Sequence, residues 1–183
     1  MIRTVPLKGN TINFSRDEIQ ERIATIGGTF DTLHQGHKDY INLAFDFAHY
    51  VIIYIKTDEY VNGKKIYQVR PYQERYEKLA EFVRRIGVKD KCEIRPHGNA
   101  NDFVTDYLNE FTRHDVLYMA MVAPEYYEKF LAINRLRESK GMNSILLVVK
   151  PRFRDGNNDL SSSAVRCLGL EATPSMSSLN LIE

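Results

Sequence analysis

Short apolar runs alternate with segments of helical periodicity along most of the chain. Two runs, VIIYI at 51–55 and ILLVV at 145–149, are apolar throughout, and further runs lie at 23–26, 92–95 and 115–122. Continuous apolar runs of this length, rich in β-branched residues, indicate strands that are buried on both faces. The pattern therefore predicts five strands.

Segments with apolar residues every three or four positions separate these strands and predict helices. Pro71 is placed to begin one of them and Gly87 to end it. Strands that alternate with helices need right-handed crossovers, so we expect one α/β domain over 23–170, with a parallel five-stranded sheet and helices on both faces. The predicted helices cover 37–48, 71–86, 100–111 and 124–139.

The remaining segments are polar. Residues 1–22 predict an N-terminal extension, 57–70 and 152–159 predict loops, and 171–183 predict a flexible tail. The first 22 residues contain no apolar stretch typical of a secretory signal, and no run approaches the roughly 20 residues of a membrane span. The two cysteines have no metal-ligand spacing and are expected to be reduced thiols. We therefore expect a cytoplasmic protein.

The charge balance limits the choice of partners. The chain has 25 Lys and Arg against 24 Asp and Glu, for a net charge of +1, and 43% of its residues are hydrophobic. It has no basic stripe, so neither a nucleic acid nor a membrane surface is expected as a partner. An anionic ligand would have to be held by a few well-placed side chains.

The residues after the first predicted strand are the strongest candidates, because ligands of such sheets bind beyond the carboxyl ends of the strands. The segment reads GGTFDTLHQGH from Gly27 to His37. Gly28 allows close backbone approach, Thr29 adds a hydroxyl, and His34 and His37 stand beside a helix start, where N–H groups favour anions. This is neither a GxGxxG fingerprint nor a loop ending in GK[ST]. The pattern predicts an anion site.

A second candidate follows the last predicted strand, where the chain reads LSSSAVR from Leu160 to Arg166. Serine is a good N-cap, so an ordinary helix start is one interpretation. The other is an anion cradle, in which serine hydroxyls and free N–H groups act together with the guanidinium of Arg166.

Together the two segments resemble the two signatures of the HxGH nucleotidylyltransferase superfamily. Gly28–Asp31 with His34–His37 is similar to the first, and Leu160–Arg166 is similar to the second, ISSTxIR, over a span of about 23–166. The resemblance implies a Rossmann-like fold that binds a nucleoside triphosphate. The nucleotide-binding residues that it implies are Gly28, Thr29, Phe30, His34, His37, Ser161, Ser162, Ser163 and Arg166.

The acceptor half resembles the phosphopantetheine adenylyltransferases of this superfamily. Lys64-Lys65 is followed by Pro71-Tyr72 and then Arg75. The resemblance implies that Thr29, Lys64 and Arg75 bind the acceptor and that Lys64 also meets the transition state. Read from the residues alone, Lys64 could be a solvated loop lysine and Arg75 a surface residue of its helix.

The chain lacks the Arg-Gly-Leu-Arg run of the bacterial pantetheine enzymes. Its Pro124-Glu125-Tyr126 turn and the later Ile-Asn-x-x-Arg of 133–137 are similar to the archaeal and eukaryotic branch. Asn134 and Arg137 are therefore either functional residues or part of a helix surface.

The resemblance implies transfer of AMP from ATP to 4′-phosphopantetheine, giving dephospho-coenzyme A and diphosphate. His37, Lys64 and His34 are the expected catalytic residues, with His34 helping to hold the triphosphate. Mg²⁺ is expected to bind through the substrate phosphates and not through a protein metal site, because it keeps several of its waters. Asp31 either supports the metal indirectly or caps the turn, and an oligomer is possible.

Two groups of alternatives stay open. On the same scaffold, the chain could be a cytidylyltransferase or an adenylyltransferase of nicotinamide mononucleotide or flavin mononucleotide. The sequence NDLSSS at 158–163 argues against the glycerol-phosphate cytidylyltransferases, which carry RTEGIS near this signature. The second group is a non-catalytic nucleotide-binding module, which the intact His34, His37, Lys64 and Arg166 disfavour.

Overall fold

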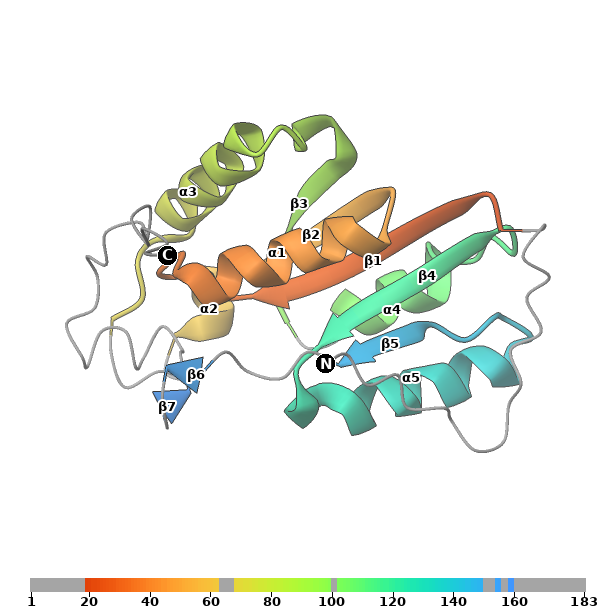
Figure 1. The fold of residues 1–183 in the computed structure, drawn as a ribbon. Helices are drawn as coiled ribbons and strands as arrows, with labels where there is room; N and C mark the ends of the chain where they lie inside the picture. The colour runs from red at the N-terminus through yellow and green to blue at the C-terminus, as the bar shows by residue number, and fades with distance from the viewer. Residues whose placement is uncertain (1–18, 63–67, 100–101, 150–153, 156–157, 160–183) are drawn as a thin grey trace.

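The computed structural model describes residues 19–62, 68–99, 102–149, 154–155 and 158–159 (Figure 1). The described residues do not include Lys64, Ser161–Ser163 or Arg166, whose roles are predicted from the sequence. They also leave out most of the N-terminal extension and all of the tail.

The centre of the fold is a five-stranded sheet in the order β3-β2-β1-β4-β5, with every neighbouring pair parallel. This confirms the predicted Rossmann-like architecture. Parallel pairing brings the carboxyl ends of the strands to one edge, where Gly28 pairs with Ile55 and Lys56 pairs with His97. The strands are β1 Glu21–Gly28, β2 Tyr50–Lys56, β3 Cys92–His97, β4 Val116–Val122 and β5 Leu146–Val149.

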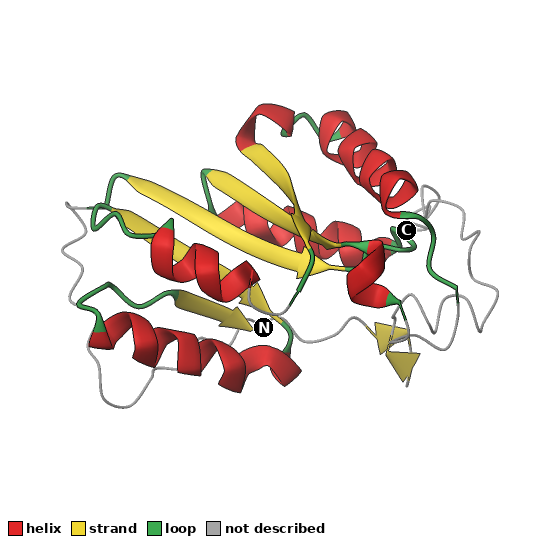
Figure 2. Ribbon diagram, turned by 180° about the vertical axis from the view of Figure 1, so that it is seen from behind, coloured by secondary structure: helices red, strands yellow, loops and turns green. Residues whose placement is uncertain are grey.

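Helices cover both faces of the sheet, as the two opposite views show (Figures 1 and 2). α1 and α3 pack on one face, and α4 and α5 pack on the other. A two-stranded antiparallel pair, β6 Arg154–Asp155 and β7 Asn158–Asp159, follows the sheet. The helices are α1 Gln35–Phe47, α2 Asp58–Val61, α3 Tyr72–Arg85, α4 Asp102–Asn109 and α5 Tyr127–Ser139, with 3-10 turns at Lys89–Lys91 and Pro124–Tyr126.

The core consists of two apolar layers separated by the sheet. In β2, Val51, Ile53 and Ile55 pack toward α1 and α3, whereas Ile52 and Tyr54 pack toward α4 and α5. All five are at most 4% exposed, which confirms that this run is covered on both faces. The same prediction is wrong for β5, because β5 is an edge strand of the sheet and Leu146 is 37% exposed.

The segment 57–70, expected to be a loop, contains the short helix α2. Its start fits the local sequence, because the Thr57 hydroxyl accepts a hydrogen bond from the backbone N–H of Tyr60, and Asp58 and Glu59 stand in the first turn. The predicted helix over 124–139 begins with a 3-10 turn, and α1 begins two residues before His37. Within the described ranges, every helix is too short or too polar to span a bilayer.

Candidate active site

The first candidate segment occupies the carboxyl edge of the sheet, between β1 and α1. His34 is the N-cap residue of α1, and its carbonyl accepts hydrogen bonds from the backbone N–H groups of His37 and Lys38 at 2.9 and 3.2 Å. The rings of His34 and His37 stack with centroids 3.9 Å apart. The predicted placement of both imidazoles beside a helix N-terminus is therefore confirmed.

The turn that carries the histidine pair contains an unusual backbone conformation. Phe30 has φ of 51°, in the left-handed region, although it is not glycine and is 1% exposed. The centroid of its ring lies 5.1 Å from the centroid of the His37 ring. Such strain persists only where the surrounding packing enforces it, and it is common at functional sites.

Both glycines before this turn leave room for aromatic rings. A Cβ on Gly28 would lie 3.1 Å from the ring of Phe30, and a Cβ on Gly27 would lie 2.8 Å from Cζ of Phe103 in α4. The Gly-Gly pair therefore lets the chain pass between two packed rings. The sequence indicates close approach at this point but does not identify these rings as the neighbours.

His37 is oriented by the loop that precedes it. Its Nδ1 lies 2.8 Å from the carbonyl oxygen of Thr32. A carbonyl can only accept, so Nδ1 carries the hydrogen and Nε2 is on the opposite side of the ring. For Nε2 to donate to a phosphate oxygen as well, the ring must hold both protons as an imidazolium.

Asp31 is fully buried and joins this loop to the segment before α3. Its Oδ1 accepts a hydrogen bond from the backbone N–H of Arg70 at 2.8 Å, and its carbonyl accepts one from the Arg70 guanidinium at 2.7 Å. The carboxylate thus bonds to backbone, as a residue that fixes a turn does. Its indirect support of a metal stays a prediction.

Arg75 is 0% exposed, so its interpretation as a surface helix residue is wrong. The guanidinium donates to the carbonyls of Arg70, Thr29 and Lys56 at 2.7–2.8 Å, and to Oδ1 of Asp58 at 2.7 Å. These contacts fasten the ends of β1 and β2 to the first turn of α3. The predicted contact of Arg75 with an acceptor stays a prediction, and the structure shows a positioning role.

Comparison with known proteins agrees with this geometry. The family model described as "Cytidylyltransferase-like" matches residues 25–168. The chain belongs to the cytidylyltransferase-like family. The match extends from β1, which precedes the histidine pair, through the second candidate segment.

Named relatives of this cytidylyltransferase-like chain include archaeal enzymes. It is 32% identical over 146 residues to the phosphopantetheine adenylyltransferase of Methanopyrus kandleri, covering 79% of this chain and 88% of the relative. It is also 32% identical over 147 residues to the enzyme of that name from Thermococcus kodakarensis, covering 79% of this chain and 84% of the relative.

Solved structures share the fold. A protein of unknown function from Archaeoglobus fulgidus superposes with a TM-score of 0.56 at 28% identity, covering 76% of this chain and 99% of that one. A putative nicotinate-nucleotide adenylyltransferase from Vibrio parahaemolyticus superposes with a TM-score of 0.51, covering 82% of each chain. At 15% identity this second likeness shows the fold alone.

Two other predicted candidates of the cytidylyltransferase-like domain lie away from solvent. Asn134 is 3% exposed and exchanges two hydrogen bonds with the backbone of Ile145, at 2.9 and 2.8 Å. Arg137 is 1% exposed and donates to the carbonyls of Asn143, Tyr107 and Phe111. The helix-surface interpretation of both is wrong, because these side chains fasten α5 to β5 and α4.

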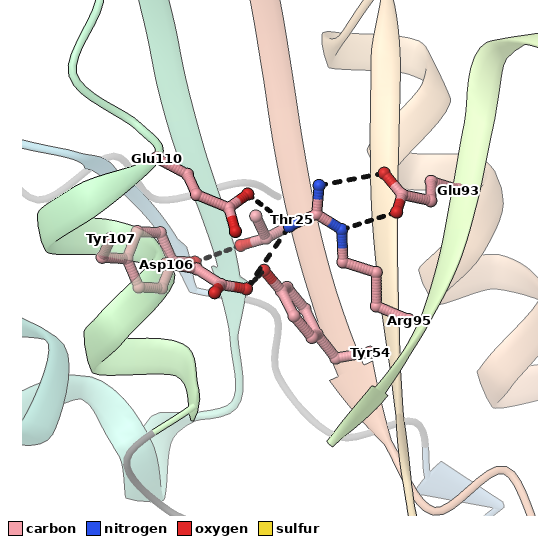
Figure 3. Close-up of polar contacts among 7 residues, drawn as sticks. All are labelled: Thr25, Tyr54, Glu93, Arg95, Asp106, Tyr107 and Glu110. Carbon is pink, nitrogen blue, oxygen red and sulfur yellow. Dashed lines mark hydrogen bonds and ion pairs between the residues drawn. The ribbon is translucent and has the colours of Figure 1, made fainter. Parts of the chain in front are cut away.

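A polar network that sequence reasoning missed lies on the face of the sheet that α4 and α5 cover (Figure 3). The Tyr54 hydroxyl donates a hydrogen bond to Asp106. The Arg95 guanidinium donates two hydrogen bonds to Glu93, at 2.8 and 3.0 Å, and one to Glu110 at 2.6 Å, so it connects these two carboxylates. Burial raises the pKa of Tyr54, so its hydroxyl stays a donor. The network joins β2 and β3 to α4, and only the tertiary fold brings these positions together.

His97, at the carboxyl end of β3, is a second residue that the sequence did not single out. It is 4% exposed and packs against the rings of Tyr60 at 4.9 Å and Phe103 at 4.2 Å. Its pKa is lowered from 6.5 to about 4, chiefly by burial. A hydrogen bond with the Asn99 backbone and the charge of Asp102 oppose this shift, and the charge of Lys56 adds to it.

This buried imidazole should make stability depend on acid pH. The pKa in the folded state is below its ordinary value, so the unfolded chain binds the proton more readily. The contribution is complete above pH 6.5 and is lost as the pH falls toward 4. From the size of the shift, it amounts to at most about 3 kcal/mol.

The measurement compares urea unfolding of the natural chain and His97→Phe at pH 7, 5.5 and 4. A phenyl ring fits the aromatic packing and does not titrate, so the variant should lose less stability than the natural chain over this range. The same loss in both proteins would contradict the assignment to His97.

Proposed function

We propose that this chain transfers the adenylyl group of ATP to 4′-phosphopantetheine, giving dephospho-coenzyme A and diphosphate. The observation that carries the proposal is the stacked His34 and His37 pair at the N-terminus of α1, directly beyond the strained turn after β1. Helix N–H groups and imidazole there can receive a triphosphate. The names of the archaeal relatives support phosphopantetheine as the acceptor.

The reaction needs little covalent participation from the protein. An oxygen of the acceptor phosphate attacks the α-phosphorus of ATP in line, and the bond from that phosphorus to the bridging oxygen of diphosphate breaks. A phosphomonoester is largely dianionic near neutrality, since its second pKa is about 6, so no general base has to remove a proton. Catalysis then consists of positioning and charge stabilisation.

We assign the α-phosphate end of the nucleotide to residues that the structure describes. Thr32 orients the ring of His37 so that Nε2, opposite the anchored Nδ1, donates to an α-phosphate oxygen as negative charge develops. His34, stacked on that ring, helps hold the triphosphate. We assign stabilisation of the acceptor and of the transition state to Lys64. We assign binding of the departing diphosphate to Ser161–Ser163 and Arg166.

Mg²⁺ would be held chiefly by the phosphate oxygens of the substrate. Within the described ranges, no three His, Cys, Asp or Glu side chains gather closely enough to hold a metal ion. Mg²⁺ commonly keeps several waters and binds substrate phosphates with few protein carboxylates, and this is the arrangement that we propose. When bound, the ion neutralises phosphate charge.

A diphosphate-release screen tests the proposed function. It crosses ATP and CTP with 4′-phosphopantetheine, nicotinamide mononucleotide, flavin mononucleotide and glycerol phosphate. We expect release only with ATP and phosphopantetheine together, with dephospho-coenzyme A identified by mass spectrometry. Release with another pair would assign the chain to a different nucleotidylyltransferase, and no release with any pair would favour the non-catalytic module.

A further inference from the structure

A cavity lies beside the candidate active site, between the start of α1 and α3. Its volume is about 310 Å³. Lys38, Arg70, Lys78 and Arg85 line it, together with one acidic side chain, Glu81. Leu33 and Phe82 supply an apolar wall. The lining therefore has four cations and one anion, although the whole chain carries a net charge of only +1.

Glu74 forms ion pairs with two of these cations, Lys78 at 2.6 Å and Arg70 at 3.3 Å. The Glu74 side chain is 44% exposed and Lys78 is 47% exposed, and ion pairs in contact with solvent contribute little. The guanidinium of Arg85 lies 5.6 Å from the centre of the Phe82 ring. Arginine and lysine arranged around a concave surface can bind a phosphate group with charge-assisted hydrogen bonds.

The cavity lies next to the candidate nucleotide site, because Thr32 and Leu33 of the loop between β1 and α1 also line it. The described residues assigned to the triphosphate, which are Gly28, Thr29, Phe30, His34 and His37, do not line it. The cavity also differs in composition, since its cations come from α1, α3 and the segment just before α3.

We propose that this cavity binds a compound with a di- or triphosphate group and that its occupancy regulates the adjacent loop. The phosphates would contact Lys38, Lys78 and Arg85, and an organic portion, where the compound has one, would lie against Leu33 and Phe82. This site is additional to the proposed transferase site, and its binding test does not depend on turnover.

Arg70 provides the physical connection between the two sites. It lines the cavity, and its guanidinium donates to the carbonyl of Asp31 at 2.7 Å and to the hydroxyl of Thr32 at 3.3 Å. The carbonyl of Thr32 in turn accepts from Nδ1 of His37. A phosphate that draws Arg70 into the cavity competes with these loop contacts and loosens the anchor of His37. Occupancy should therefore slow adenylyl transfer.

Calorimetric titration tests binding, with inorganic tripolyphosphate and ADP as probes. The Lys78→Ala/Arg85→Ala double variant should lose one binding phase, with affinity at least about tenfold weaker, as expected for removal of charged contacts. The control Arg84→Ala removes an exposed arginine from the same last turn of α3 but not from the cavity, so it should keep that phase. Tighter binding of ADP than of tripolyphosphate would assign the apolar wall to an organic group.

Kinetics tests the regulation, with diphosphate release measured against ATP at fixed tripolyphosphate. Competition at the active site raises only the KM for ATP, whereas occupancy of the cavity should also lower kcat, by a few-fold. That decrease in kcat should vanish in the double variant and persist in Arg84→Ala. Identical binding isotherms for the double variant and the natural chain, with matching thermal melts, would overturn the proposed site. An unchanged kcat effect in the double variant would overturn the regulation.

Discussion

Replacement of His37 by alanine is expected to lower kcat for adenylyl transfer by about 10²- to 10³-fold, the effect of removing one donor to a developing oxyanion. The hydrogen bond to Thr32 and stacking on His34 hold the ring in a defined orientation. Its Nε2 donor is therefore already in position, and no reorganisation is needed during the reaction. Because the contact strengthens in the transition state, kcat should fall more than the KM for ATP rises.

Two amide substitutions separate the two ends of the ring. Asparagine at position 37 places an N–H near the position of Nδ1, so it can keep the bond to Thr32 but cannot reach the phosphate. Glutamine places its amide near the position of Nε2 and loses the anchor instead. If Nε2 is the group that meets the transition state, His37→Gln should retain more activity than His37→Asn.

The control is His114→Ala, which removes an exposed histidine just before β4, away from the carboxyl edge of the sheet. It should keep full activity. A thermal melt of each variant shows whether the fold survives the loss of the His37 ring, which contacts the Thr32 carbonyl and the rings of Phe30 and His34. Unchanged turnover in a folded His37→Ala protein would remove His37 from the mechanism.

The success of sequence reasoning for the fold has a physical basis. The run VIIYI must be buried on both faces because a parallel strand with helices above and below has no solvent side, and β2 confirms this. The equally apolar ILLVV gave the same expectation, but β5 is an edge strand. Strand order depends on tertiary packing, so apolar periodicity alone could not distinguish a central strand from an edge strand.

In the candidate site, as in the fold, contacts between residues close in sequence could be predicted, whereas contacts made only by the tertiary fold could not. Gly28, His34 and His37 belong to one short segment, so their spacing after a strand was enough to place them together. Arg75 and Asn134 were ambiguous because a charged or amide side chain on a helix is usually exposed. Their burial depends on backbone groups at or beside the strand ends, which only the tertiary fold brings close, and apolar periodicity does not indicate such contacts. His97 was missed for a related reason, because its aromatic neighbours Tyr54, Tyr60 and Phe103 come from three separate elements, β2, α2 and α4.

Arg75→Met is expected to lower the free energy of unfolding by about 3–5 kcal/mol, the range for removing one member of a buried charged cluster. Methionine fills much of the volume but leaves the carbonyls of Thr29, Lys56 and Arg70 without their donor. Each buried acceptor left unsatisfied costs about 1–3 kcal/mol. The free energy of unfolding of Arg75→Lys should lie between those of the natural chain and Arg75→Met, because an ammonium keeps the charge but cannot reproduce the planar guanidinium fork.

Two further variants identify which contacts carry this energy. Asp58→Asn removes the charge of the ion pair and leaves one amide oxygen for two donors, the Arg75 guanidinium and the backbone N–H of Tyr72. Since the Asp58 side chain is 44% exposed, the substitution should cost about 1 kcal/mol or less. Arg84→Met, at an exposed position of the same helix, should change stability by less than about 0.5 kcal/mol. Urea unfolding monitored by circular dichroism measures all four variants. If Asp58→Asn cost as much as Arg75→Met, the ion pair and not the carbonyl contacts would hold the strand ends, and Arg75 would position Thr29 only indirectly.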